Sequence, residues 1–191
     1  MLWLLSLLSA ANPVEVQDGD IIFQTTNSSQ SEAIQYATES PFSHVGIIHI
    51  RDGQPVVFEA RGPVGAIPLQ SWINKGIQGK YQIMRPKKAL KTAQIKRMYK
   101  AAERHRGKSY DWLFEWSDQK MYCSELVWKL YKEAGIELAQ PRPMDSYRFD
   151  SPVVQEKLAE RWGDAVNWKE KMVAPSDLAT SPLLTVIADT Y

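Results

Sequence analysis

The chain has very few of the residues that bind metals or form cross-links. Its 191 residues include a single cysteine, Cys123, and three histidines. One cysteine excludes an internal disulfide framework and a multi-cysteine zinc site. His44 and His49 lie an odd number of residues apart in a strand-like run, which places their side chains on opposite faces. His105 lies between two arginines and is expected at the surface. We therefore expect no metal site, and nothing in the sequence requires a cofactor.

Excess charge and internal repeats are also absent from the sequence. The 23 Lys and Arg residues nearly balance the 22 Asp and Glu residues, which leaves a net charge of +1. This gives no electrostatic basis for binding nucleic acid, and no basic cluster is interleaved with aromatic residues. The length and the 44% hydrophobic content favour a single domain over residues 12–191. The sequence indicates no particular oligomeric state.

The chain has no hydrophobic run long enough to span a bilayer as a helix, but it begins with a short one. Residues 1–11 (MLWLLSLLSAA) are apolar and end in small residues. This pattern is typical of a secretory signal peptide, although no Lys or Arg precedes it. We therefore expect a periplasmic or secreted protein. The alternative is a buried N-terminal helix.

Short strands dominate the first half of the chain and helices the second. A hairpin is predicted from the β-branched run 43–50 and the strand 55–60, joined by a turn at 51–53. The other expected strands are 21–24, 65–69 and 81–85. The expected helices are 31–38 with Ser31 as its N-cap, one that begins with Thr92 as its cap and ends at Gly107, 123–134, and 153–162; residues 174–178 are expected to form a loop. This order favours an α+β fold.

Cys123 begins a predicted helix whose apolar residues Leu126, Val127, Leu130 and Tyr131 recur at helical spacing. In the first turn, free backbone N–H groups and the positive end of the helix dipole lower the pKa of a thiol. Cys123 is therefore a candidate nucleophile. The alternative is a buried structural thiol, because free cysteine is among the most buried residue types.

A thiolate nucleophile needs a base, which is usually a histidine oriented by a third polar group. His44 begins a strand directly after a turn, and Glu59 lies on the partner strand of the predicted hairpin. Cross-strand pairing would place the Glu59 carboxylate beside the His44 imidazole. The sequence thus predicts a Cys123, His44 and Glu59 triad. Taken singly, His44 also fits a structural histidine and Glu59 a solvated strand residue.

Four motifs, in this order, resemble those of the permuted papain-like amidases of the YaeF and YiiX type, which belong to the wider NlpC-like group of cysteine hydrolases. The motifs are residues 19–24 (GDIIFQ), 43–47 (SHVGI), 58–60 (FEA), and 110–111 (YD) followed by 122–127 (YCSELV). His44 precedes Cys123, as the circular permutation of these proteins requires. The segment 175–178 (PSDL) is similar to their C-terminal part.

The resemblance implies a fold in which a small antiparallel sheet or barrel packs on helices. It implies that Cys123 is the nucleophile, His44 the general base and Glu59 the third polar member. Tyr110 resembles the tyrosine that shapes the oxyanion site in the wider group, where the backbone N–H of Cys123 would be a second donor.

Two other residues are alternatives for the third position, Gln24 and Asp20, although Asp20 is better explained by a backbone turn. The resemblance implies hydrolysis of an amide through a Cys thioester. Cell-wall peptides and N-acyl or lipid-linked amides are the expected substrates, with contact to the cell envelope or to lipid. The alternatives are a lipid acyltransferase or thioesterase of the lecithin retinol acyltransferase type, with an apolar channel that the many tryptophans could line, and a binding module without catalysis.

Overall fold

The computed structural model describes residues 14–191, and the predicted signal peptide at 1–11 lies outside them. Its centre is a six-stranded antiparallel sheet with the order β4-β3-β2-β1-β5-β8. The strands of this sheet are β1 (Ile21–Gln24), β2 (His44–Arg51), β3 (Gln54–Glu59), β4 (Gly65–Pro68), β5 (Gln82–Pro86) and β8 (Leu184–Asp189). A separate two-stranded ribbon consists of β6 (Arg142–Pro143) and β7 (Lys171–Met172). The predicted hairpin is confirmed as β2 and β3, which pair from Ile47 with Phe58 to Arg51 with Gln54.

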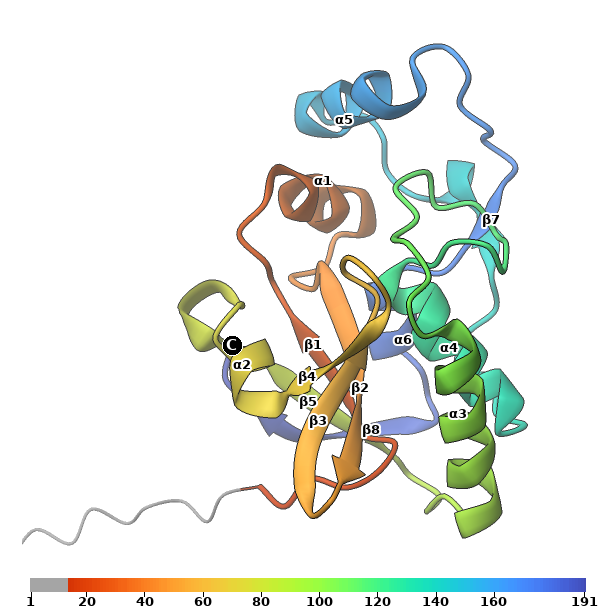
Figure 1. Cartoon of the computed structure of the whole chain (residues 1–191). Helices are drawn as coiled ribbons and strands as arrows, with labels where there is room; N and C mark the ends of the chain where they lie inside the picture. Colours follow the sequence, from red (N-terminus) through yellow and green to blue (C-terminus); the bar gives the residue numbers. More distant parts are fainter. Residues whose placement is uncertain (1–13) are drawn as a thin grey trace, which may run out of the picture.

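Helices cover both faces of the sheet and extend beyond one end of it (Figure 1). They are α1 (Ser29–Thr38), α2 (Leu69–Ile73), α3 (Thr92–His105), α4 (Cys123–Glu133), α5 (Pro152–Trp162) and α6 (Pro175–Ala179), with short 3-10 helices at Ile77–Gly79 and Met144–Ser146. Helix α4 packs against β2, β3 and α3, α2 lies on the opposite face, and α1 packs against α5. The α+β prediction is confirmed. Over residues 14–191, no helix is long and apolar enough to cross a membrane.

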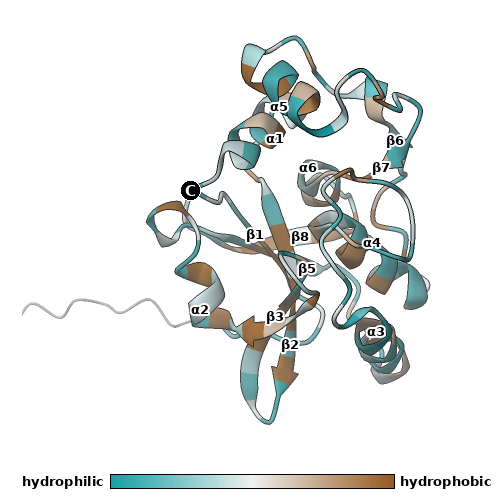
Figure 2. Ribbon diagram, turned by 45° about the horizontal axis from the view of Figure 1, so that its top comes forward, coloured by the Kyte–Doolittle hydropathy of each residue, from teal (hydrophilic) through white to brown (hydrophobic). Residues whose placement is uncertain are grey.

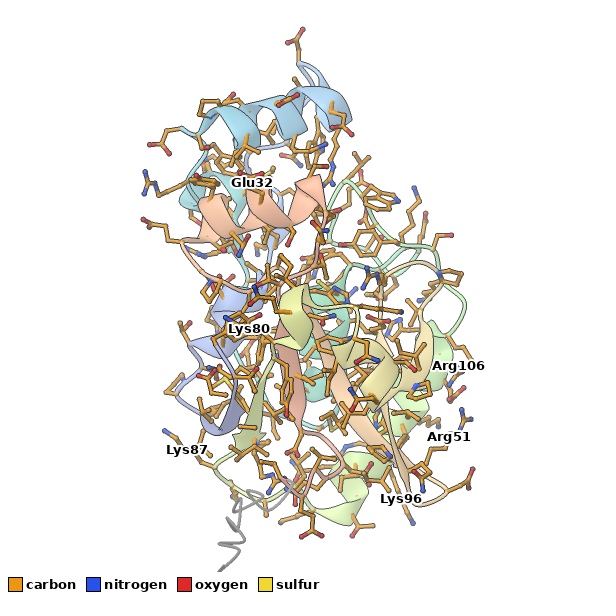
Figure 3. All side chains as sticks on the ribbon, turned by 90° about the vertical axis from the view of Figure 1, so that its left-hand side faces the viewer. Glu32, Arg51, Lys80, Lys87, Lys96 and Arg106 are labelled. Atoms are coloured by element: carbon orange, nitrogen blue, oxygen red, sulfur yellow. The ribbon has the colours of Figure 1, made fainter. Side chains whose placement is uncertain are left out.

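The strand alternation divides the core into two layers. Ile21 and Phe23 of β1 face the layer that holds α3 and α4, whereas Ile22 faces Trp72 of α2. Hydrophobic residues accordingly concentrate on the strands and the inward sides of the helices in Figure 2. Charged side chains such as Arg51 and Lys96 lie at the periphery in Figure 3. A small third cluster lies between α1 and α5.

Three local predictions were wrong. Helix α1 is capped by Ser28 and not by Ser31, because the backbone of Ser28 is extended and its side chain accepts the Ser31 N–H. Lys91 is the N-cap of α3, so Thr92 is its first residue. The segment 175–179, expected to be a loop, forms the short helix α6.

The surface position predicted for His105 was also wrong, because the side chain is only 7% exposed. Met98, Ala101, Ala102 and His105 form the buried stripe of α3 at helical spacing. The flanking arginines suggested exposure, but the helical period decides which face is buried. The Nδ1 atom of His105 lies 3.0 Å from the Lys108 ammonium.

Candidate active site

Helix α4 places Cys123 at its first residue, where the side chain is 3% exposed. The helix is held there by a fully buried stripe that includes Leu126, Val127 and Leu130. The first four N–H groups of a helix have no acceptor within it, so the Cys123 N–H makes no hydrogen bond inside α4. The Ser124 hydroxyl donates to the Val173 carbonyl oxygen at 2.7 Å and fixes this end of the helix.

The hairpin brings His44 and Glu59 together because β2 begins where β3 ends. The Nε2 atom of His44 lies 2.6 Å from Oε2 of Glu59, and both side chains are 6% exposed. With Nε2 directed at the carboxylate, the other ring nitrogen is left for Cys123. Among the three candidates for the third position, the structure thus places Glu59 at the imidazole.

Two residues that the sequence did not single out hold the Glu59 carboxylate. The Trp72 indole N–H donates to Oε2 at 2.8 Å, and the Lys75 ammonium lies 3.5 Å from Oε1. The Trp72 ring also stacks on His44, with the ring centroids 5.8 Å apart. Gly46 lies beneath the indole and is required by the packing of its neighbour, because a Cβ atom there would lie 2.4 Å from a side-chain carbon of Val57. Glu59 is thereby oriented from three sides.

The charges of the three groups support one another. Burial lowers the pKa of His44, but interactions with Cys123 and Glu59 outweigh it and raise the pKa to about 9. Burial raises the pKa of the Cys123 thiol, yet hydrogen bonding and the charge of His44 bring it below its usual value. The pKa of Glu59, which burial would raise, is also lowered by His44. The arrangement favours a thiolate, an imidazolium and a carboxylate in a row.

Tyr110 lies beside the nucleophile because it forms an isolated β-bridge with Met121, just before α4. Its hydroxyl oxygen accepts a hydrogen bond from Nε2 of Gln30 at 3.2 Å. Within residues 14–191 its own proton has no acceptor, so it remains available to a ligand. Burial, and then the charge of Cys123, raises the pKa of Tyr110 well above its usual value. The phenol therefore stays protonated and able to donate.

Neither of the other candidates for the third position bonds to the imidazole. Asp20 binds other groups, and the Gln24 side chain lies near the strand pair without a hydrogen bond to any of residues 14–191. Asp20 accepts two hydrogen bonds from Arg85, at 2.8 and 2.7 Å, and one from the Gln17 N–H. It therefore fixes a turn and an ion pair, as the turn interpretation predicts. Gln24 pairs with His44 across β1 and β2, but its buried amide has no hydrogen-bond partner within the described residues.

Two cavities adjoin the triad, and they differ in character. The first is bounded by Cys123 and Ser124 and has an empty volume of about 690 Å³, including its opening to solvent. Its walls are mostly apolar and combine aliphatic and aromatic side chains from α1, α5, the connection before α5 and the segments next to α4 and α6. They include Ala33, Ile34, Ala37, Met144, Val154, Leu158, Phe114, Tyr122, Tyr147 and Phe149. Trp162 also lines this cavity. It is the one tryptophan among the described residues that does so, whereas the sequence suggested that many tryptophans could line an apolar channel.

The second cavity is polar and lies on the His44 side, with an empty volume of about 1040 Å³ on the same measure. It is bounded by His44, Tyr110, Trp112 and the hydroxyls at the start of α1. Gln30 and Arg161 line both cavities, which adjoin the triad on its Cys123 side and its His44 side. No sequence signal identified these two residues, because their proximity to Cys123 depends on how α1 and α5 fold over the end of the sheet.

The fold is shared with a solved structure, that of YiiX from Escherichia coli O157:H7, which is described as a metalloprotein. The two have a TM-score of 0.89 and 43% sequence identity, over 92% of this chain and 98% of the other. Within residues 14–191 of this chain, no group of three or more His, Cys, Asp or Glu side chains is placed to hold a metal ion.

Sequence comparisons agree with the structural one. YiiX of Escherichia coli, described as uncharacterized, is 44% identical over 173 residues, which cover 90% of this chain and 86% of that protein. The family model described as "permuted papain-like amidase enzyme, YaeF/YiiX, C92 family" matches residues 15–188. The chain therefore belongs to the permuted papain-like amidases of the YaeF/YiiX type.

Proposed function

We propose that this protein is a cysteine hydrolase that cleaves N-acyl amides and holds the acyl chain in the apolar cavity beside Cys123. Family membership supports cysteine hydrolase chemistry in general. The observation that favours an acyl chain over a cell-wall peptide is the apolar wall, aliphatic and aromatic, that begins at the nucleophile. A peptide would leave its amide groups without partners against such a wall, whereas a hydrocarbon chain gains free energy by burial.

In the proposed reaction the Cys123 thiolate attacks the amide carbonyl carbon. The Tyr110 hydroxyl and the Cys123 backbone N–H donate to the oxyanion that forms. The imidazolium of His44 gives its proton to the amide nitrogen, the C–N bond breaks, and the amine leaves. The acyl group remains on sulfur as a thioester.

Water completes the cycle. Neutral His44 takes a proton from water as the oxygen attacks the thioester carbonyl, the C–S bond breaks, and the carboxylic acid leaves. The thiolate and imidazolium are then restored. Glu59 holds the ring in one orientation through both steps and stabilises its positive charge, and Trp72 and Lys75 hold Glu59.

The test is a series of acylglycines with acetyl, octanoyl and dodecanoyl chains, alongside a cell-wall tetrapeptide. Each methylene buried is worth about 0.8 kcal/mol, so kcat/KM is expected to rise by up to about fourfold per methylene until the cavity is full. Mass spectrometry of the quenched enzyme is expected to show an acyl adduct on Cys123, and none in Cys123→Ala. Equal kcat/KM for acetyl and dodecanoyl chains, or cleavage of the tetrapeptide alone, would contradict the proposal.

Acyl transfer is the second candidate, because the same cavity and thioester would serve it. The two differ only in what attacks the thioester. Adding an alcohol or amine acceptor to the dodecanoyl assay and measuring the acylated product separates them: hydrolysis gives free fatty acid regardless of the acceptor, and transfer gives the new ester or amide.

A further inference from the structure

Arg161, in the last turn of α5, has an unusual environment for an arginine. Its guanidinium donates to one backbone oxygen, that of Trp112 at 3.3 Å, and lies over the rings of Trp112 and Phe114, 5.6 and 5.3 Å from their centroids. Within residues 14–191, no carboxylate lies within ion-pairing distance of it. Arg85, by contrast, is held by both oxygens of Asp20. A guanidinium has five N–H donors in a planar fork, so most of those of Arg161 are unused.

The position of Arg161 is as informative as its lack of partners. A cation in the last turn complements the helix dipole, but this does not require the side chain to be half-buried in a cavity wall. Arg161 lines the polar cavity together with His44, and it also borders the apolar one. Burial among aromatic rings lowers the pKa of Arg161, so an anion placed there would relieve a desolvated charge.

The other charged groups of the polar cavity leave it positive. Lys157 and Glu160 pair with each other. Arg61 lines the cavity without an ion pair in the described part of the chain, and His44 carries a proton in the resting pair. Arg61 and Arg161 thus face the space next to the triad. Among the described residues, the carboxylate that lines this space, Glu160, is paired with Lys157, and the charges of Glu59 and Glu160 act on Arg61 and Arg161 only from beyond ion-pairing distance.

We propose that the amine portion of the substrate carries an anionic group, a carboxylate or a phosphate, that Arg161 binds in the polar cavity. The inference rests on the proposed function. His44 protonates the leaving nitrogen, so the amine leaves on the His44 side, where Arg161 lies, while the acyl chain occupies the apolar cavity. The substrate class is then an N-acyl amino acid or an N-acylaminoalkyl phosphate, which water cleaves to a fatty acid and an anionic amine.

Three substrates with one acyl chain test this: N-dodecanoylglycine, N-dodecanoylglycinamide and N-dodecanoyl-O-phosphoethanolamine. A charge-assisted bidentate contact predicts that the preferred anionic substrate exceeds the neutral amide in kcat/KM by about tenfold to a hundredfold. The ratio is expected to fall toward one in Arg161→Gln and to be partly kept in Arg161→Lys. Arg148→Gln is the matched control, because that guanidinium pairs with Glu39 and Asp150 on the surface outside both cavities.

The ratio of kcat/KM between the anionic and neutral substrates separates recognition from a local folding defect, because a folding defect would lower all three values alike. Preference for glycine or for the phosphate assigns the anion, and loss of that preference in Arg161→Gln supports the site. Equal rates for glycine, phosphate and amide overturn the inference and leave the proposed function standing.

A second readout does not depend on turnover. Protection of Cys123 from iodoacetamide by each of the three compounds gives their affinities in the unchanged protein and in Arg161→Gln. If no amide is hydrolysed, the proposed function fails, and the anion site is still decided by protection. Tenfold tighter protection by an anionic compound, lost in Arg161→Gln, supports it, and equal or absent protection overturns it.

Discussion

His44 and His49 lie on the same strand, are 5% and 4% exposed, and have their pKa values moved in opposite directions, to about 9 and about 4. As the sequence predicted, their side chains face opposite sides: His44 stacks on Trp72, and His49 packs against the tilted ring of Tyr99 with the ring centroids 4.2 Å apart. Burial lowers the pKa of both. What differs is the set of partners, because Glu59 and Cys123 contact only His44.

The region around His49 shows that a nearby carboxylate is not enough. Asp18 lies 4.0 Å from Nδ1 of His49, but its Oδ1 atom already accepts the Ile50 N–H at 2.8 Å and the Tyr99 hydroxyl. Neither ring nitrogen of His49 has a hydrogen-bond partner within the described chain. One end of β2 therefore holds a histidine that its partners keep charged, and the other end holds a neutral one that fills space.

The largest expected effect separates the two histidines by activity. His44→Ala is expected to lower kcat/KM by about 10²- to 10⁴-fold, because it removes the group that transfers the proton. His49→Leu, a change of similar volume on the other face, is expected to keep the activity within a few fold. The measurement is amide hydrolysis with the preferred acylglycine, with circular dichroism as the folding control. Equal losses in the two variants would contradict the assignment of roles.

The next effect is on stability in acid and belongs to His49. Its folded pKa of about 4 lies below the unfolded value of 6.5, so its contribution is complete above pH 6.5 and is lost as the pH falls through 4. The shift corresponds to about 3 kcal/mol of unfolding free energy. Urea unfolding at pH 7 and pH 4 is expected to show a smaller acid loss in His49→Leu than in the unchanged protein. An identical loss of unfolding free energy in the two proteins would show that protonation of His49 does not destabilise the fold.

A smaller effect is expected from the carboxylate that sets the charge of His44. Glu59→Gln keeps the shape of the side chain and removes its charge, so the pKa of His44 is expected to fall by about 1 to 2 units from its value of about 9. NMR titration of His44 measures this fall in pKa. The rate of Cys123 alkylation at neutral pH is expected to decrease as well. Glu103→Gln, an exposed carboxylate on the His49 side, is the control and should leave His44 unchanged.

The two ends of β2 also show how far the sequence could predict this site. The hairpin, the first-turn position of Cys123 and the pairing of His44 with Glu59 follow from local patterns, since strand alternation and helical spacing fix which residues share a face. The burial of His105 follows from the same helical spacing, whereas its arginine neighbours taken alone indicate exposure.

Trp72, Gln30 and Arg161 could not be found in this way. Each is brought to the site by tertiary packing. Trp72 contacts Glu59 and His44 because α2 folds back on the sheet, whereas Gln30 bonds to Tyr110 and Arg161 lines the cavities because α1 and α5 pack together beyond the end of the sheet. No short-range pattern encodes such contacts. The sequence therefore predicts the reacting groups better than the groups that orient them or shape the cavities, which is why it also left the substrate open.

The smallest expected effect concerns the two donors that hold Glu59. The Trp72 indole is fully buried, whereas the Lys75 side chain is 39% exposed and its ammonium lies 3.5 Å from the carboxylate. Exposed ion pairs contribute about 0.2 to 1 kcal/mol, since water and salt screen them. Lys75→Gln is therefore expected to change unfolding free energy by less than about 1 kcal/mol, while Trp72→Phe costs more, because it removes a buried charge-assisted hydrogen bond. Urea unfolding at low and high salt measures both, and a larger loss in Lys75→Gln would mean that the ammonium, and not the indole, orients Glu59.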